Sequence, residues 1–291
     1  MKLAAFPKCF MDQLVVNHTM TVFDWIKMAA DLPIHGLEMY SGFLESYEIA
    51  YLESVRRAIE QRGLEMPMFC CSPDFTSPDA EERRRQIENE KKMIDATATL
   101  GGGFCRVLSG QRRPEVSRAQ GVQWVVECLQ ELIEYAARKN VVLTLENHYK
   151  DNYWSHPEFA QKSDVFIEIL NKVESPWLGA QFDPSNTILA GEDPIDLLQK
   201  IKRRVVTMHA SDRRLKPGHT LEELQRVEDS IGYAAILSHG VIGSGLNDFP
   251  KIFSILRSVG FDGWVSIEDG VNGFDEIRKS AEFLTPFIRG S

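Results

Sequence analysis

The chain is poor in the features that mark secreted and membrane proteins. Its 291 residues include five cysteines, an odd number without a CxxC spacing, so the sequence offers no disulfide framework. No apolar run approaches the roughly 18 residues of a membrane span, and the N-terminus lacks the long apolar stretch and small-residue cleavage site of a signal peptide. We therefore expect a cytoplasmic protein with no membrane partner.

Positive charge is also in short supply. Lys and Arg total 33 against 42 Asp and Glu, which gives a formal net charge of −9, so a phosphate backbone is repelled on average. The basic runs at residues 83–85 and 203–204 are expected on solvated surfaces. We expect no nucleic-acid partner. The 43% hydrophobic and 26% charged content is typical of a globular protein.

Short apolar runs and longer amphipathic segments alternate along the whole chain. The first kind has the composition of buried strands, and the second has helical spacing. The predicted strands are residues 2–7, 36–40, 65–71, 103–110, 141–148, 178–183, 205–212 and 264–269. The predicted helices are residues 22–32, 51–61, 79–100, 116–138, 163–173, 194–201, 249–259 and 274–288.

This alternation predicts an α/β fold, a single (β/α)8 TIM barrel. Parallel strands need long return connections, and eight strand–helix units suit a chain of this length. No GxGxxG follows a predicted strand, and "GGG" at residues 101–103 is interpreted as a helix stop. We expect residues 1–291 to form one domain, with an extended loop after strand seven at about residues 213–247.

Polar residues stand at the ends of the last four predicted strands. The stretch "VVLTLENH" begins with the branched aliphatic residues of a buried strand and reaches Glu146, and the next three strands end in Asp183, His209 and Glu268. The carboxyl ends of barrel strands meet at one mouth. Three carboxylates and an imidazole would repel one another there without a cation. The sequence therefore predicts one divalent ion held by these four residues; oxygen donors with one histidine favour Mn²⁺, Mg²⁺ or Co²⁺, with Zn²⁺ as an alternative.

Each of the four residues also has a simpler interpretation when taken alone. Glu146 would serve as an ion-pair partner, Asp183 in "FDPSN" would begin a turn, and His209 would be a hydrogen-bonded core residue. Glu268 beside Asp269 would be surface charge. Their occurrence in four consecutive units favours the metal site.

Four stretches, "LTLENH", "GAQFDPSN", "VVTMHASD" and "GSGLNDFPKIFSILRSVGFDGWVSIED", resemble the xylose isomerase-like TIM barrel superfamily of sugar isomerases and epimerases, which includes relatives of AP endonuclease family 2. The resemblance covers nearly the whole chain. It implies that the four strand-end residues bind one divalent ion, often Mn²⁺, and that Glu146 and Glu268 serve as acid and base. The endonucleases need further histidines at earlier strand ends, and "MFCCSPD" and "CRVLSG" contain none. Together with the negative net charge, this argues against a nuclease.

This constellation predicts proton transfer at the carbon beside a carbonyl. A divalent ion would stabilise the enediolate, and one glutamate would remove a proton that the other returns. Return to the opposite face gives epimerisation, return to the adjacent carbon gives isomerisation, and loss of the β-hydroxyl gives dehydration. We expect a metal-dependent isomerase or epimerase of a keto sugar or related polyol. The alternatives are a lyase, either an inosose-type dehydratase or a 3-keto-glycoside-cleaving enzyme, and a non-catalytic sugar-binding barrel.

Five further residues are predicted to contact the carbohydrate: Tyr40, His148, Asn186, Asp212 and Arg214. They lie at or just beyond strand ends, on the expected catalytic face. Tyr40 suits packing as well as stacking on a sugar, and many ketose epimerases of the superfamily have a histidine in place of Asn186. His219 and His239 fall in the long loop and receive no assigned role. A homo-oligomer is left open.

Overall fold

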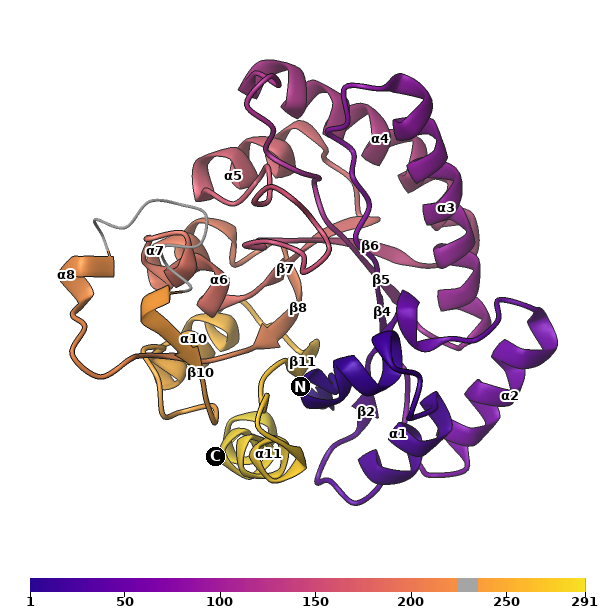
Figure 1. The fold of residues 1–291 in the computed structure, drawn as a ribbon, viewed down its shortest axis with the longest axis vertical. Helices are drawn as coiled ribbons and strands as arrows, with labels where there is room; N and C mark the ends of the chain where they lie inside the picture. Colours follow the sequence, from indigo (N-terminus) through magenta and orange to yellow (C-terminus); the bar gives the residue numbers. More distant parts are fainter. Residues whose placement is uncertain (225–234, 291) are drawn as a thin grey trace.

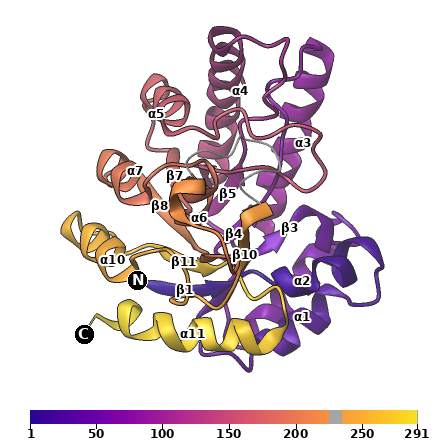
Figure 2. The same ribbon diagram turned by 60° about the vertical axis from the view of Figure 1, so that its left-hand side comes forward.

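The computed structural model describes residues 1–224 and 235–290, whose strands form a nearly closed parallel barrel with helices around it (Figures 1 and 2). The strands are β1 (Lys2–Ala5), β2 (Gly36–Leu37), β3 (Met39–Tyr40), β4 (Met68–Cys70), β5 (Phe104–Val107), β6 (Val142–Glu146), β7 (Leu178–Phe182), β8 (Val205–Ala210), β9 (Arg213–Leu215), β10 (Leu237–His239) and β11 (Trp264–Ile267). The α-helices are α1 (Val22–Ala29), α2 (Ile49–Glu60), α3 (Ala80–Thr99), α4 (Arg118–Lys139), α5 (Ser163–Lys172), α6 (Pro184–Leu189), α7 (Pro194–Ile201), α8 (Leu221–Leu224), α10 (Phe249–Ser258) and α11 (Phe274–Arg289). None of the described helices combines the length and the apolar character that crossing a membrane requires.

The barrel sheet has the strand order β2-β1-β11-β8-β7-β6-β5-β4-β3. The predicted strand at residues 36–40 is divided into β2 and β3 at Glu38. β2 pairs with β1, and the backbone N–H of Leu37 donates to the carbonyl of Glu65 at 2.9 Å. The two ends of the sheet therefore meet beside Glu38, and the predicted TIM barrel is confirmed, with a second strand in two pieces.

The helices begin where the sequence supplies capping groups. The side chain of Thr21 accepts from the backbone of Asp24 in a capping box, and Asp79, Ser117 and Asp193 cap α3, α4 and α7. The eight predicted helices start within two residues of observed ones. Helix α6 was not predicted, because "DPSN" resembles a turn; Pro184 instead occupies its first position.

One large apolar cluster fills the barrel and the layer between strands and helices. Trp25 of α1, Phe166 of α5 and Phe253 of α10 are fully buried members of it. Phe253 also stacks on Phe287 of α11, with ring centroids 4.9 Å apart. This packing fixes the helices around the strands, so the strand ends that carry the polar residues are held in place.

The segment after β8 contains more regular structure than the predicted loop at 213–247. β9 and β10 pair antiparallel, with Arg213 opposite His239. A small apolar cluster joins this segment to α6; its members are Ile188, Leu189, Leu224, Ile236 and Leu237. Residues 225–234 of the predicted loop lie outside the described residues.

Glu90 of α3 is a buried carboxyl group in the layer between α3 and the barrel. The thiol of Cys105 on β5 donates to its Oε1 at 3.3 Å, and the Sγ of Cys71 lies 4.0 Å from that of Cys105. Thiols are weak donors. Burial raises the pKa of Glu90 to about 7, so the folded protein keeps this carboxyl mostly protonated below about pH 7.

We predict that Glu90→Gln stabilises the protein at pH 8 and leaves stability unchanged at pH 4. In the unfolded chain this carboxyl ionises near pH 4.3. The penalty for its raised folded-state pKa therefore grows between about pH 4.3 and 7 and persists above, on the order of 3 kcal/mol in the free energy of unfolding. Thermal unfolding at both pH values measures the difference.

Glu88→Gln, an exposed change on the same helix, is the matched control and should shift the melting temperature little at either pH. An equal shift by Glu90→Gln at pH 4 and pH 8 would contradict the buried-carboxyl interpretation.

Candidate metal centre and cavity

Four residues from adjacent strands converge at one end of the barrel. Glu146 is the last residue of β6, Asp183 follows β7, His209 lies in β8 and Glu268 follows β11. These four strands are neighbours in the sheet. One ligand atom from each residue lies within 4.8 Å of all the others. The structure therefore brings together the four side chains that the sequence singled out.

The cluster is almost sealed from solvent. Glu146 and His209 are 0% exposed, Asp183 is 1% exposed and Glu268 is 9% exposed. Burial, together with the charges of Glu268 and Glu146, raises the pKa of Asp183 to about 7. The charges of Glu268 and Glu146 thus disfavour the ionised form of Asp183. Burial also opposes ionisation of Glu146 and Glu268, yet His209, Arg106 and Lys8 lower the pKa of these two carboxyls. A positive charge among the ligand atoms would remove the repulsion at Asp183.

The donor set fits a divalent cation. Three carboxylates and one imidazole offer oxygen and nitrogen ligands without a thiolate, which suits Mn²⁺, Mg²⁺, Co²⁺ or Zn²⁺. Glu146 Oε2 is buried and accepts no hydrogen bond from the described residues, although Arg106 Nε lies 3.3 Å away. A cation bound by the four residues would satisfy that oxygen.

His209 is oriented by a glutamate behind it. Its Nε2 lies 2.9 Å from Oε2 of Glu38, the residue that divides β2 from β3, and its Nδ1 lies 3.1 Å from Glu146 Oε1. If Nε2 carries the proton and donates to Glu38, the Nδ1 lone pair faces the carboxylates. Such outer carboxylates commonly fix the tautomer of a metal-binding histidine.

Asp183 is held by its neighbours on both sides. Ser211 donates its hydroxyl to Oδ1 at 2.8 Å and to Oδ2 at 3.0 Å. The amide of Asn147 accepts from the backbone N–H of Asp183 at 2.8 Å and donates to its carbonyl at 2.7 Å. Asn186 donates its backbone N–H to Oδ1 at 3.0 Å. The turn after β7 therefore leaves the carboxylate little freedom.

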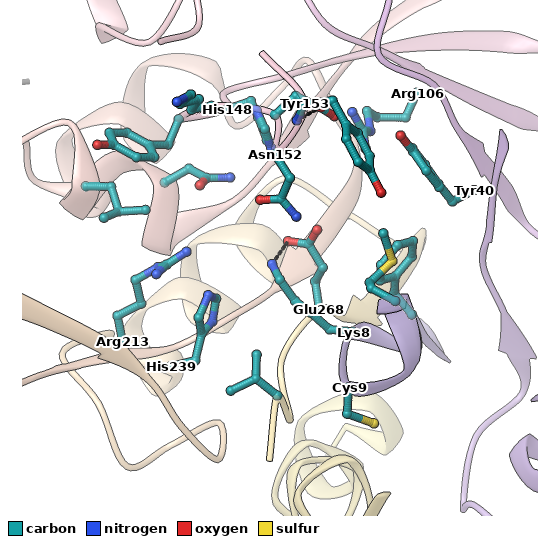
Figure 3. A pocket seen from close by; sticks show the side chains of 18 of the residues that line it. Lys8, Cys9, Tyr40, Arg106, His148, Asn152, Tyr153, Arg213, His239 and Glu268 are labelled. Atoms are coloured by element: carbon teal, nitrogen blue, oxygen red, sulfur yellow. Dashed lines mark hydrogen bonds and ion pairs between the residues drawn. The ribbon is translucent and has the colours of Figure 1, made fainter. Parts of the chain in front are cut away.

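A cavity of about 570 Å³ reaches this cluster at Glu268, which is the one member of the four that lines it. Figure 3 shows Glu268 and Lys8 at its centre, Arg213 and His239 along one wall, and Arg106, Tyr40 and Tyr153 on the opposite side. Lys8 Nζ lies 3.4 Å from Glu268 Oε2. The lining is mostly polar, as a ligand rich in hydroxyl groups requires.

His148 and Asn186, both predicted to contact substrate, line this cavity, as does Tyr40. His148 Nδ1 lies 3.7 Å from Oε2 of Glu158, whose Oε1 accepts from the backbone N–H and the hydroxyl of Ser109. Although burial opposes it, the carboxylates of Glu158 and Glu146 raise the pKa of His148.

Asp212 and Arg214, the other two predicted contacts, do not line the cavity. Asp212 is buried and accepts the backbone N–H groups of Gly243, Gly245 and Asn247 at 2.8–3.2 Å, so it anchors the segment after β10. Arg214 is exposed. Side chains alternate along a strand, and the neighbouring Arg213 lines the cavity instead.

Sequence reasoning missed several residues of the site: Lys8, Glu38, Arg106, Arg213 and His239. Arg106 lies inside β5, in "CRVL", and its guanidinium donates a hydrogen bond to the carbonyl of Cys71 at 2.9 Å. A charged residue within a predicted buried strand was a usable signal, because such residues are costly unless paired. Glu38 in "GLEMY" gave the same signal. Lys8 and His239 lie outside the predicted strands and gave none.

Comparisons with known proteins identify the family and the fold. A family model described as xylose isomerase-like TIM barrel matches residues 26–287. The inosose dehydratase of Geobacillus thermodenitrificans (strain NG80-2) is 20% identical over 247 residues, which cover 79% of each protein. Among solved structures, the IolI protein with a binding zinc atom superposes with a TM-score of 0.77 at 16% identity, covering 99% of this chain and 98% of that one. A D-tagatose 3-epimerase-like protein gives 0.75 at 19% identity, covering 99% and 97%.

We predict that Glu38→Ala weakens the binding of a divalent cation about 10- to 100-fold, a typical effect of losing such an outer partner. Without the carboxylate, His209 Nε2 loses the acceptor 2.9 Å away that sets its orientation. Glu38→Gln keeps an acceptor and should fall between Glu38→Ala and wild type. Titration calorimetry with Mn²⁺ on metal-stripped protein measures the dissociation constants.

Glu65→Gln, at an exposed glutamate paired with Lys2, is the control and should bind as the wild type does. Unchanged affinity in a folded Glu38→Ala variant would show that Glu38 does not position His209.

Proposed function

The chain belongs to the xylose isomerase-like TIM barrel family, and from this premise we propose that it is a divalent-metal-dependent epimerase or isomerase of a keto sugar or related polyol. One observation carries the proposal. Glu146 and Glu268 converge with Asp183 and His209 so closely that four ligand atoms lie within 4.8 Å of one another. This arrangement pairs two candidate acid–base groups with one cation site.

Glu146, Asp183, His209 and Glu268 would hold the cation, for which Mn²⁺ is our first expectation, with Mg²⁺, Co²⁺ and Zn²⁺ as alternatives. When bound, a divalent ion supplies the positive charge that stabilises a developing enediolate and fixes the substrate's orientation. The zinc of the IolI structure is a property of that protein and supports only the general expectation of a divalent ion.

The two glutamates have different surroundings, which suits different roles. Glu268 lines the cavity and meets Lys8, so it is the carboxylate that faces a bound substrate. Glu146 lies deeper, fully buried beside Arg106. One carboxylate would remove the proton from the carbon beside the carbonyl, and the other would return a proton to the opposite face or to the adjacent carbon.

The cavity suits a small carbohydrate as the partner. Its volume of about 570 Å³ lies within the usual range for small-molecule sites. His148, Asn186 and Asn152 present polar groups that hydrogen-bond hydroxyls, and Tyr40 offers an aromatic face. These contacts would orient the substrate so that one carbon lies beside Glu268.

A second candidate function is dehydration of a keto polyol. The observation that favours it is His148, which lines the cavity with Glu158 behind it, because expulsion of a hydroxyl needs an acid that protonates it. The named relative from Geobacillus thermodenitrificans is an inosose dehydratase. Both reactions begin with the same proton abstraction, so the same four residues serve either.

We predict that Glu268→Gln lowers turnover at least 100-fold while the fold remains intact, since the amide neither accepts the substrate proton nor ligates a cation well. In D₂O, wild-type protein with Mn²⁺ should incorporate deuterium at the carbon beside the carbonyl, and the variant should not. NMR of keto sugars and inososes follows both events. Glu282→Gln, at an exposed position on α11, is the control; wild-type exchange by the Glu268 variant would remove this residue from the mechanism.

The dehydratase candidate predicts a separable effect at His148. If a hydroxyl is expelled, His148→Asn should slow the loss of water at least tenfold while deuterium exchange continues, because proton removal precedes departure of the leaving group. His18→Asn, an exposed histidine, is the control. Formation of an epimer without any dehydrated product would eliminate this candidate.

A further inference from the structure

Arg213 is a cavity residue whose guanidinium has no hydrogen-bond or ion-pair partner in the part of the chain that the structure describes. It is the first residue of β9, opposite His239 of β10, and Figure 3 shows both side chains directed toward the centre of the cavity. Its Nε is buried and without a hydrogen bond. Among the described residues, 1–224 and 235–290, none forms a hydrogen bond or an ion pair with the Arg213 side chain.

An unpaired, poorly solvated guanidinium is costly, so its place in the cavity calls for an explanation. Burial lowers the pKa of Arg213, yet an arginine remains charged in proteins. Arg106, the other arginine of this cavity, shows the contrast. It donates to the carbonyl of Cys71 at 2.9 Å and pairs with Glu146.

The nearby acids are already engaged elsewhere. Asp269 accepts from the backbone N–H of Asp212 at 2.7 Å, and its other oxygen lies 3.0 Å from Nδ1 of His239. Asp183 accepts from Ser211, and Glu268 pairs with Lys8. The fork of donors on Arg213 therefore remains available to a ligand in the cavity.

We propose that Arg213 binds a carboxylate of the substrate, so that the enzyme acts on an acidic keto sugar rather than a neutral one. This inference rests on the proposed function and names its substrate class. A planar guanidinium matches a carboxylate with two parallel hydrogen bonds. His239 lies beside Arg213, and Lys8 lies at the centre of the cavity (Figure 3). The two acids nearest to this wall, Asp269 and Glu268, contact His239 and Lys8 respectively.

The segment after β10 argues for a carboxylate over a phosphate. The glycine-rich stretch "GVIGSG" at residues 240–245 has the composition of a phosphate-binding loop. Four of its six amides are occupied. Gly243 and Gly245 donate to Asp212 Oδ2, Ile242 donates to the hydroxyl of Ser280, and Ser244 donates to the carbonyl of Val241. A phosphate bound here would contact the guanidinium of Arg213, but this loop would not surround it with free backbone N–H groups.

The test compares ligands that differ only in the acidic group and cannot react. D-Gluconate, D-glucitol and D-glucitol 6-phosphate are titrated calorimetrically into Mn²⁺-loaded protein. We expect wild type to bind gluconate at least tenfold more tightly than glucitol, and more tightly than glucitol 6-phosphate. Arg213→Gln should abolish the preference for gluconate, and Arg213→Lys should keep only part of it, because a point charge lacks the planar fork.

Arg214→Gln is the matched control, since the adjacent arginine is exposed and does not line the cavity; it should keep the full preference. Equal binding of gluconate and glucitol by wild type would overturn the inference. So would a preference that survives in Arg213→Gln and Arg213→Lys, since gluconate would then bind elsewhere, for example on the cation alone. Tighter binding of glucitol 6-phosphate than of gluconate would overturn the choice of carboxylate.

The anion site at Arg213 and the proposed reaction can be disproved independently. If wild type prefers gluconate through Arg213 but exchanges no deuterium into any keto sugar acid, the proposed reaction is wrong and the anion site stands. If neutral keto sugars turn over with the same kcat/KM as their acidic counterparts in wild type and in Arg213→Gln, the reaction stands and the anion site is wrong.

Discussion

Repulsion among buried carboxylates is the constraint on which this site depends. Glu146, Asp183 and Glu268 surround His209 where little water reaches them, and like charges in such surroundings are expensive unless a cation or suitable donors offset them. Each carboxylate has a polar or cationic neighbour: the hydroxyl of Ser211 donates to Asp183, and Arg106 and Lys8 form ion pairs with Glu146 and Glu268. The divalent ion that we propose would bind among the ligand atoms that face one another. The clustered carboxylates thus lower the free energy of unfolding but form a binding site. Such local destabilisation is common at functional sites.

The barrel produces this convergence through strand order alone. β6, β7, β8 and β11 are adjacent and parallel, so residues at their carboxyl ends are neighbours whatever their separation in the chain. Local structure then refines the positions. Asp183 caps α6, whose first residue is Pro184, and Asn147 at the end of β6 bonds the backbone on both sides of Asp183. A rigid frame holds the ligands before any ion binds, which reduces the conformational entropy lost on binding.

The sequence predicted the repeating units and the four strand-end residues, because both depend on short-range pattern and on chain order. Helix starts follow capping groups and periodicity, which a single sequence carries. The sequence did not predict which side chains contact the four clustered residues from behind. Glu38, between β2 and β3, contacts His209 across a separation of 171 residues in the chain. Arg106 meets Glu146 only because β5 and β6 pair in one particular register. Successive side chains of a strand point to opposite faces, so only one of Arg213 and Arg214 can point into the cavity. The pairing of β9 with β10 determines which one does, and the sequence "SDRRL" does not specify that pairing.

Net charge and local charge lead to different conclusions about partners, and both are consistent with this molecule. The chain carries −9 overall, which disfavours a long polyanion whose many phosphates would face the whole surface. A small anion experiences mainly the charges within about 8 Å, the screening length at physiological ionic strength.

The cavity is lined by four cationic side chains, Lys8, Arg106, Lys150 and Arg213, and by three acidic ones, Asp12, Asp151 and Glu268. A bound divalent ion would engage Glu268, which now pairs with Lys8, and would leave the lysine free. Occupation of the cation site would therefore make the cavity more positive, so cation and acidic substrate are expected to bind cooperatively.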